Sequence, residues 1–162
     1  MKRALSIRIH LLALVTLCFL LLATDADAQR KKRKEQLATV IQTAKGYLGT
    51  PYLYGGTTRK GIDCSGLIYT SYKAAGITLP RTAEAQAKAG KARGWEELRE
   101  GDIVLFKFKD DGEKWWHSGM ITYVKGEQIK FIHASSSRGV VESDLMNDYY
   151  RKNVKRFRRV IK

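Results

Sequence analysis

Apolar positions are spaced differently in the two halves of the chain. In residues 36–48 they recur every three or four positions, which predicts a helix. A second helix is expected over residues 64–75, where Gly76 marks its end. A short third helix should cover residues 82–88, because Thr82 is a residue type suited to cap a helix start.

The second half changes to short runs rich in Val, Ile, Phe and Tyr, separated by glycines and charged residues. Residues 52–63 are glycine-rich and indicate a loop. Residues 107–116 should form a charged and aromatic loop, in which Trp115 and Trp116 either line a cleft or cover the sheet edge. Helices followed by strands predict an α+β domain with an antiparallel sheet. The expected strands cover residues 102–108, 118–124, 129–134, 140–141 and 155–161, with a short helix at 144–150.

Residues 1–28 have the pattern of a secretory signal peptide. A basic start precedes an uncharged apolar run over residues 11–23, and Ala26-Asp27-Ala28 supplies a small-residue cleavage site. The basic run that follows, residues 30–34, resists export, so an uncleaved N-terminal anchor is the alternative. Either way, the chain is expected to be exported to the periplasm or cell envelope.

Residues 29–35 are expected to be a disordered basic tether, followed by a single folded domain over residues 36–162. The chain carries a net charge of +14, which favours polyanionic partners. Because the signal peptide argues against nucleic acid, we expect contacts with anionic envelope polymers or lipid, and a monomer. A charged surface that is merely solvated is the alternative.

One cysteine and two histidines remain once the signal peptide is set aside. Cys64, His117 and His133 supply one candidate each for a nucleophile, its base and a group that orients the base. Cys64 is expected at a helix start, where the helix dipole should lower the pKa of the thiol. The alternative is that Cys64 is a small buried core residue.

The histidines fall on neighbouring predicted strands. A three-residue loop that pairs Val124 with Gln128 would set Gly119 opposite His133, with His117 a diagonal neighbour about 7–8 Å away. A two-residue loop would turn one histidine to the other face. One cysteine and two histidines could instead bind zinc, although the close ligand pairs typical of zinc sites are missing from the sequence.

Several short motifs, in order, resemble the NlpC-type cell-wall cysteine peptidases. The resemblance covers residues 36–161. It rests on these blocks: Gly49-Thr50-Pro51-Tyr52, Gly55-Gly56, Asp63-Cys64-Ser65-Gly66-Leu67, Gly76-Ile77, Leu79-Pro80-Arg81-Thr82 with Gln86, Gly101-Asp102-Ile103-Val104, His117-Ser118-Gly119-Met120, Ile132-His133-Ala134 and Gly139-Val140. Ser118 departs from the small apolar residue usual in the family, which should alter packing only.

The resemblance implies a papain-like α+β fold and hydrolysis of peptidoglycan stem peptides, commonly at the bond from D-glutamate to diaminopimelate or lysine. Cys64 would attack the carbonyl, His117 would act as base and His133 would orient it, with no cofactor. Four further residues would contact substrate or the oxyanion: Tyr52, Asp63, Ser65 and Thr82. For Asp63, Ser65 and Thr82 the alternative is helix capping or another purely local role, and Tyr52 could simply pack.

Two other functions fit the same residues. An acyltransferase would use the same acyl-enzyme but resolve it with an amine or lipid in place of water. A non-catalytic wall-binding protein would keep the fold and leave the thiol unreactive.

Overall fold

The computed structural model describes residues 25–110 and 113–162, which belong to two compact units, residues 1–35 and 36–162. In the first unit, residues 25–35 are helical, with a side-chain hydrogen bond from Arg33 to Gln29. The expectation that residues 29–35 are disordered is therefore wrong, because Lys, Arg, Glu and Gln are good helix formers. The apolar run of the expected signal peptide lies outside the described residues. Within them, no helix has the length and hydropathy needed to cross a membrane.

The second unit begins with helical residues 36–45, followed by the two-stranded sheet of β1 (Thr57–Thr58) and β2 (Gly61–Ile62). Helix α2 (Cys64–Ala74) then packs its apolar face inward, as the sequence predicts, and Gly76 follows it with a φ of 74°. Helix α3 (Ala83–Gln86) is shorter than predicted, but Thr82 caps it: the Thr82 side chain accepts a hydrogen bond from the Ala85 amide.

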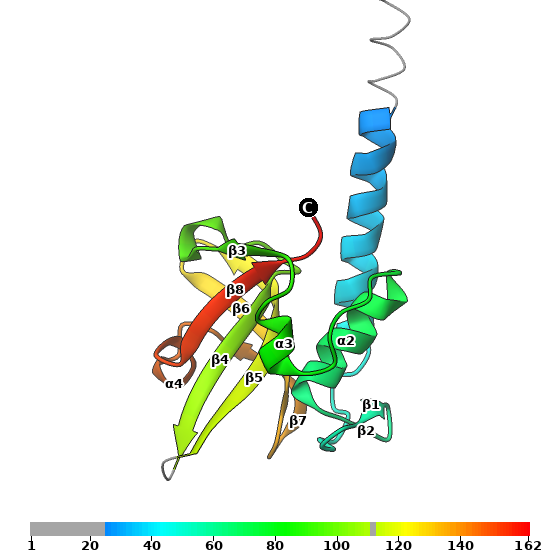
Figure 1. Cartoon of the computed structure of the whole chain (residues 1–162). Coiled ribbons are helices and arrows are strands. Elements are labelled where there is room, and N and C mark those ends of the chain that lie inside the picture. The colour runs from blue at the N-terminus through cyan, green and yellow to red at the C-terminus, as the bar shows by residue number, and fades with distance from the viewer. Residues whose placement is uncertain (1–24, 111–112) are drawn as a thin grey trace, which may run out of the picture. The chain divides into compact units, whose positions relative to one another are not determined.

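Six antiparallel strands form the main sheet in the order β3-β8-β4-β5-β6-β7 (Figure 1). The α+β architecture of helices against an antiparallel sheet is thus confirmed. The strands are β3 (Lys91–Arg93), β4 (Ile103–Asp110), β5 (Glu113–Lys125), β6 (Gln128–Ser135), β7 (Gly139–Asp144) and β8 (Val154–Arg159), with 3-10 helix η1 (Trp95–Glu97) and helix α4 (Asp148–Arg151) between them.

The segment 107–116 differs from expectation. Instead of a loop, β4 and β5 pair along it, with Lys107 opposite Trp116 and Phe108 opposite Trp115. Its aromatic residues favour extended backbone, and cross-strand ring contacts such as Phe108 with Trp115, 5.7 Å between centroids, stabilise the hairpin.

The turn between β5 and β6 also differs. Lys125 pairs with Gln128, so the loop has two residues, not three. A bulge between Ile121 and Tyr123 then shifts the register by one residue, so that Met120 pairs with Ile132. The register near the histidines is therefore the predicted one, but the bulge produces it and not the loop.

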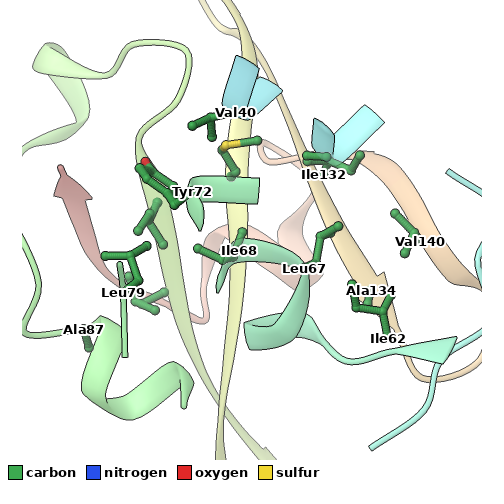
Figure 2. Packing of buried hydrophobic residues seen from close by; sticks show 14 residues of the cluster. Val40, Ile62, Leu67, Ile68, Tyr72, Leu79, Ala87, Ile132, Ala134 and Val140 are labelled. Atoms are coloured by element: carbon green, nitrogen blue, oxygen red, sulfur yellow. The ribbon is translucent and has the colours of Figure 1, made fainter. Parts of the chain in front are cut away.

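Both faces of the sheet are buried. One cluster joins the helices to the sheet (Figure 2) and includes Val40, Leu67, Ile68, Tyr72, Leu105, Met120 and Ile132. The other is richer in aromatic residues and includes Phe106, Phe108, Phe131, Leu145 and Phe157. Neighbouring residues of β5 and β6, the strands that carry the histidines, enter opposite clusters, so both strands are packed on both faces.

Candidate active site

Cys64 is the first residue of α2 and a free cysteine with 9% of its surface exposed. Asp63 is the N-cap of this helix, and its carboxylate accepts a 2.6 Å hydrogen bond from the Gly66 amide. Cys64 lines a cavity of about 700 Å³ together with His117 and His133. The structure therefore brings the three residues singled out in the sequence into one cavity.

The two histidine rings are hydrogen-bonded to each other. Nε2 of His117, on β5, lies 2.9 Å from Nδ1 of His133, on β6, and the rings are nearly perpendicular at 88°. Phe131 stacks on His133 with 4.7 Å between ring centroids. Nδ1 of His117 takes no part in this bond. It is therefore the ring nitrogen that can accept a proton in the cavity.

Burial lowers the pKa of both histidines. For His117 desolvation is the main cause, opposed by the negative charge of Asp63. For His133 desolvation comes first, and the charges of His117 and Arg138 lower the pKa further. Both imidazoles are therefore neutral at neutral pH, the form a general base requires.

The Cys64 thiol does not have the lowered pKa that its helix-start position predicts. Burial raises the pKa of Cys64, and the Asp63 carboxylate raises it as well. The backbone and side chain of Ser118 and the backbone of Ser65 lower the pKa of the thiol but do not outweigh burial. The resting site is thus a neutral thiol beside a neutral imidazole, so the nucleophile needs a base to take its proton.

Asp63 is occupied on both carboxylate oxygens. Arg81 binds it in a fork, with Nη1 2.8 Å from Oδ1 and Nη2 2.7 Å from Oδ2. The Gly55 amide donates to Oδ2 at 2.8 Å and the Ser65 hydroxyl donates to Oδ1 at 3.1 Å. Although burial alone would raise it, the hydrogen bonds from Arg81 and from the Gly66 and Gly55 amides hold the pKa of Asp63 below its ordinary value. Asp63 therefore caps the helix, and its contact with a substrate amine stays a prediction.

The cleft continues on the other side of the thiol. A second cavity of about 530 Å³ is lined by Ser65, Arg81 and Thr82. The two cavities share Tyr52, Cys64, Trp115 and Trp116, so the tryptophans line the cleft. Burial raises the pKa of Tyr52, and the charges of Cys64 and Asp63 add to this.

Sequence reasoning missed the role of Arg81 and the surroundings of His133. Arg81 belongs to the motif Leu79-Pro80-Arg81-Thr82. Because the chain has many more basic than acidic residues, the sequence did not indicate that this arginine pairs with Asp63. Ser143 and Tyr150 both lie within hydrogen-bonding distance of His133. Ser143 could have been found from the strand register, since it is a diagonal neighbour of His133 across β6 and β7.

A zinc site was the alternative use of these residues. Within residues 25–110 and 113–162, no group of three or more His, Cys, Asp or Glu side chains is arranged to hold a metal ion. The nearest nitrogens of His117 and His133 face each other at hydrogen-bonding distance, which leaves no room for an ion between them.

Most of the chain is similar to known proteins. The model of the NlpC/P60 family matches residues 49–159. The probable endopeptidase NlpC of Escherichia coli is 42% identical over 125 residues, which are 76% of this chain and 78% of that protein. The murein DD-endopeptidase MepS/murein LD-carboxypeptidase of the same organism is 39% identical over 114 residues, 70% of this chain and 57% of that protein. Among solved structures, an NlpC/P60 family protein of Bacillus cereus superposes with a TM-score of 0.68 at 33% identity, over 78% of this chain and 40% of that one.

Proposed function

We propose that this chain, which belongs to the NlpC/P60 family, cuts the stem peptides of peptidoglycan at the bond from D-glutamate to diaminopimelate or lysine. Family membership makes the chain a cysteine peptidase and a peptidoglycan hydrolase. The particular bond is the part that is proposed. The observation that carries the catalytic assignment is the shared cavity of Cys64, at the start of α2, and the hydrogen-bonded pair His117–His133.

The reaction follows from the neutral resting state. His117 accepts the thiol proton on Nδ1 as the sulfur of Cys64 bonds to the scissile carbonyl carbon, and the carbonyl oxygen becomes an oxyanion. The C–N bond then breaks, and His117 gives the proton to the leaving amine. Water, deprotonated by His117, attacks the thioester; the products are a carboxylic acid and the free thiol. His133 holds the His117 ring through the 2.9 Å hydrogen bond throughout.

The oxyanion forms beside the start of α2. Backbone N–H groups of the first helical turn point outward there and favour negative charge. Tyr52 lines both cavities beside Cys64, which supports a role for its hydroxyl in holding the oxyanion or the substrate.

Ser65 and Thr82 line the second cavity and are proposed to bind the substrate peptide there. Asp63 is proposed to take part in recognition of a free peptide N-terminus. Since its carboxylate already accepts Arg81, Ser65 and two amides, a substrate ammonium would have to share these oxygens. Asp63 therefore contributes mainly by fixing the cavity wall.

The bond can be identified with defined muropeptides. The chain would be incubated with an uncross-linked tripeptide and a cross-linked dimer, and the products read by mass spectrometry. The proposal expects cleavage of the tripeptide between D-glutamate and diaminopimelate. Cleavage of the cross-link alone, the DD-endopeptidase activity for which MepS is named, would contradict the proposed bond and leave the peptidase class intact. A new covalent adduct of the acyl product would favour acyl transfer.

The proposed location is the cell envelope, where peptidoglycan lies, reached through the signal peptide of residues 1–28. Exposed basic residues, including Arg151, Lys152, Lys155 and Arg156, support electrostatic attraction to anionic envelope polymers or lipid. In a binding protein without catalysis, the cavity that Cys64 shares with His117 and His133 would have no catalytic use, so their placement argues against that reading.

A further inference from the structure

His133 makes hydrogen bonds on both sides of its ring. Nδ1 faces His117, and Nε2 lies 3.0 Å from the Ser143 hydroxyl and 3.3 Å from the Tyr150 hydroxyl. Ser143 donates to Tyr150 at 3.5 Å, and Nη2 of Arg138 donates to the Tyr150 hydroxyl at 3.2 Å. The catalytic hydrogen bond is therefore one link of a longer chain of groups.

The sheet itself sets up this chain. On β7, Val141 pairs with His133, so Ser143 is the diagonal neighbour of His133 on that side. His117 occupies the corresponding diagonal position on the β5 side. Tyr150 comes from α4 and packs its ring edge-on against His133, at 5.4 Å between centroids.

The tautomer of His133 matters for the reaction. Neutral His117 carries one ring proton, and it can accept the thiol proton on Nδ1 only if that proton is on Nε2. That proton must be donated to Nδ1 of His133, so His133 must keep its own proton on Nε2. A proton on Nε2 needs an acceptor, and the oxygens of Ser143 and Tyr150 are the two acceptors within reach.

We propose that Ser143 and Tyr150 are positioning residues that hold His133 in the tautomer protonated on Nε2, so that His117 presents a free Nδ1 to the thiol. The inference deepens the proposed function and rests on it for its catalytic meaning. Ser143 suits the role because it accepts from His133 while donating its own proton to Tyr150.

Arg138 gives this series of hydrogen bonds a direction. Its positive charge reaches the Tyr150 hydroxyl, and it opposes a second proton on His133. A proton taken from Cys64 therefore stays on His117, where the leaving amine can receive it, and does not pass on to His133.

The test reads the tautomer directly. Long-range ¹⁵N–¹H NMR of the histidine rings distinguishes the two neutral tautomers, and the chain has only three histidines to assign. The full chain in mild detergent would be compared with Ser143→Ala, Tyr150→Phe, the double variant and Ser143→Thr, which keeps a hydroxyl. Tyr123→Phe, on β5 away from the cavity, removes a tyrosine hydroxyl as the matched control.

The native chain should show His133 protonated on Nε2, and the double variant should show a mixture of tautomers. With a stem-peptide substrate, kcat should fall roughly tenfold or more in the double variant, with KM little changed. Ser143→Thr, which keeps the hydroxyl, should retain most of the native kcat. Tyr123→Phe should alter neither. A native His133 protonated on Nδ1, or a double variant that keeps the Nε2 tautomer, would overturn the inference even if no substrate is cleaved.

Discussion

Arg81 and Asp63 form a two-pronged ion pair directly beside the nucleophile, with N–O distances of 2.8 and 2.7 Å. Asp63 is 5% exposed and is also the N-cap of the helix that begins with Cys64. The pair therefore joins the start of α2 to the segment before α3 and fixes the position of the thiol. A forked guanidinium–carboxylate contact has a geometry that lysine cannot reproduce.

Replacing Arg81 should destabilise the protein, because Asp63 would keep a buried charge without its partner. Arg81→Gln is expected to lower the free energy of unfolding by about 3 kcal/mol. Arg93→Gln is the matched control, since Arg93 makes a more exposed pair with Glu97, which should be worth less than about 1 kcal/mol. Urea unfolding of both variants measures this. Equal losses in the two variants would show that the Asp63 pair has no special role.

The raised pKa of Cys64 predicts slow alkylation at neutral pH. In a Cys18→Ser background, the iodoacetamide rate should rise with pH to a midpoint above the ordinary thiol value of about 8.5. The same chain unfolded in urea should titrate near the ordinary value and serves as the reference. A folded midpoint below that of the unfolded chain would mean that the helix start outweighs burial.

Ser118 offers a sharper test of what stabilises the thiolate. Its side chain is fully buried, and among the described residues its hydroxyl has no partner of good hydrogen-bond geometry, yet it lowers the pKa of the neighbouring thiol. The hydroxyl can rotate to donate to the sulfur once the proton leaves. Ser118→Ala should therefore slow alkylation of Cys64 roughly tenfold at fixed pH.

The same variant should be as stable as the native chain or more so, because it removes a buried hydroxyl that lacks a partner. Thr122→Val is the matched control: Thr122 is on the same strand, 4% exposed, and its hydroxyl also has no partner in the described structure. It should leave the alkylation rate unchanged. A similar slowing in both variants would assign the effect to packing of β5.

The buried histidines should make the protein sensitive to acid. The pKa values of His117 and His133 are lower in the folded state than the ordinary value of about 6.5. Their contribution to stability is complete above that value and is lost as the pH falls below it, because the unfolded chain then binds more protons. The melting temperature should fall between pH 7 and pH 5, and should fall less in a His117→Asn, His133→Asn double variant. A native melting temperature that stays constant over this range would contradict the neutral, buried state of the two rings.

The sequence predicted elements best where one period of apolar residues dominates. The face of α2 and the cap at Thr82 are local features, and the structure has them as expected. The three residues Cys64, His117 and His133 were found because the composition offers few alternatives.

What the sequence did not predict depends on contacts between distant segments. The two-residue turn and the bulge near Thr122 have opposite effects on register, so the predicted alignment was correct for the wrong reason. The pKa of Cys64 depends on how deeply the thiol is buried, and the partner of Asp63 lies 18 residues away. Neither follows from spacing along the chain.

The most direct test of the catalytic assignment is digestion of purified peptidoglycan by the full chain and by Cys64→Ala, with the released peptides quantified by mass spectrometry. Our account predicts that the native chain releases stem-peptide fragments, and that a Cys64→Ala chain with an unchanged melting temperature is slower by at least about a thousandfold. Comparable release by the two chains would contradict the role of Cys64 as the nucleophile.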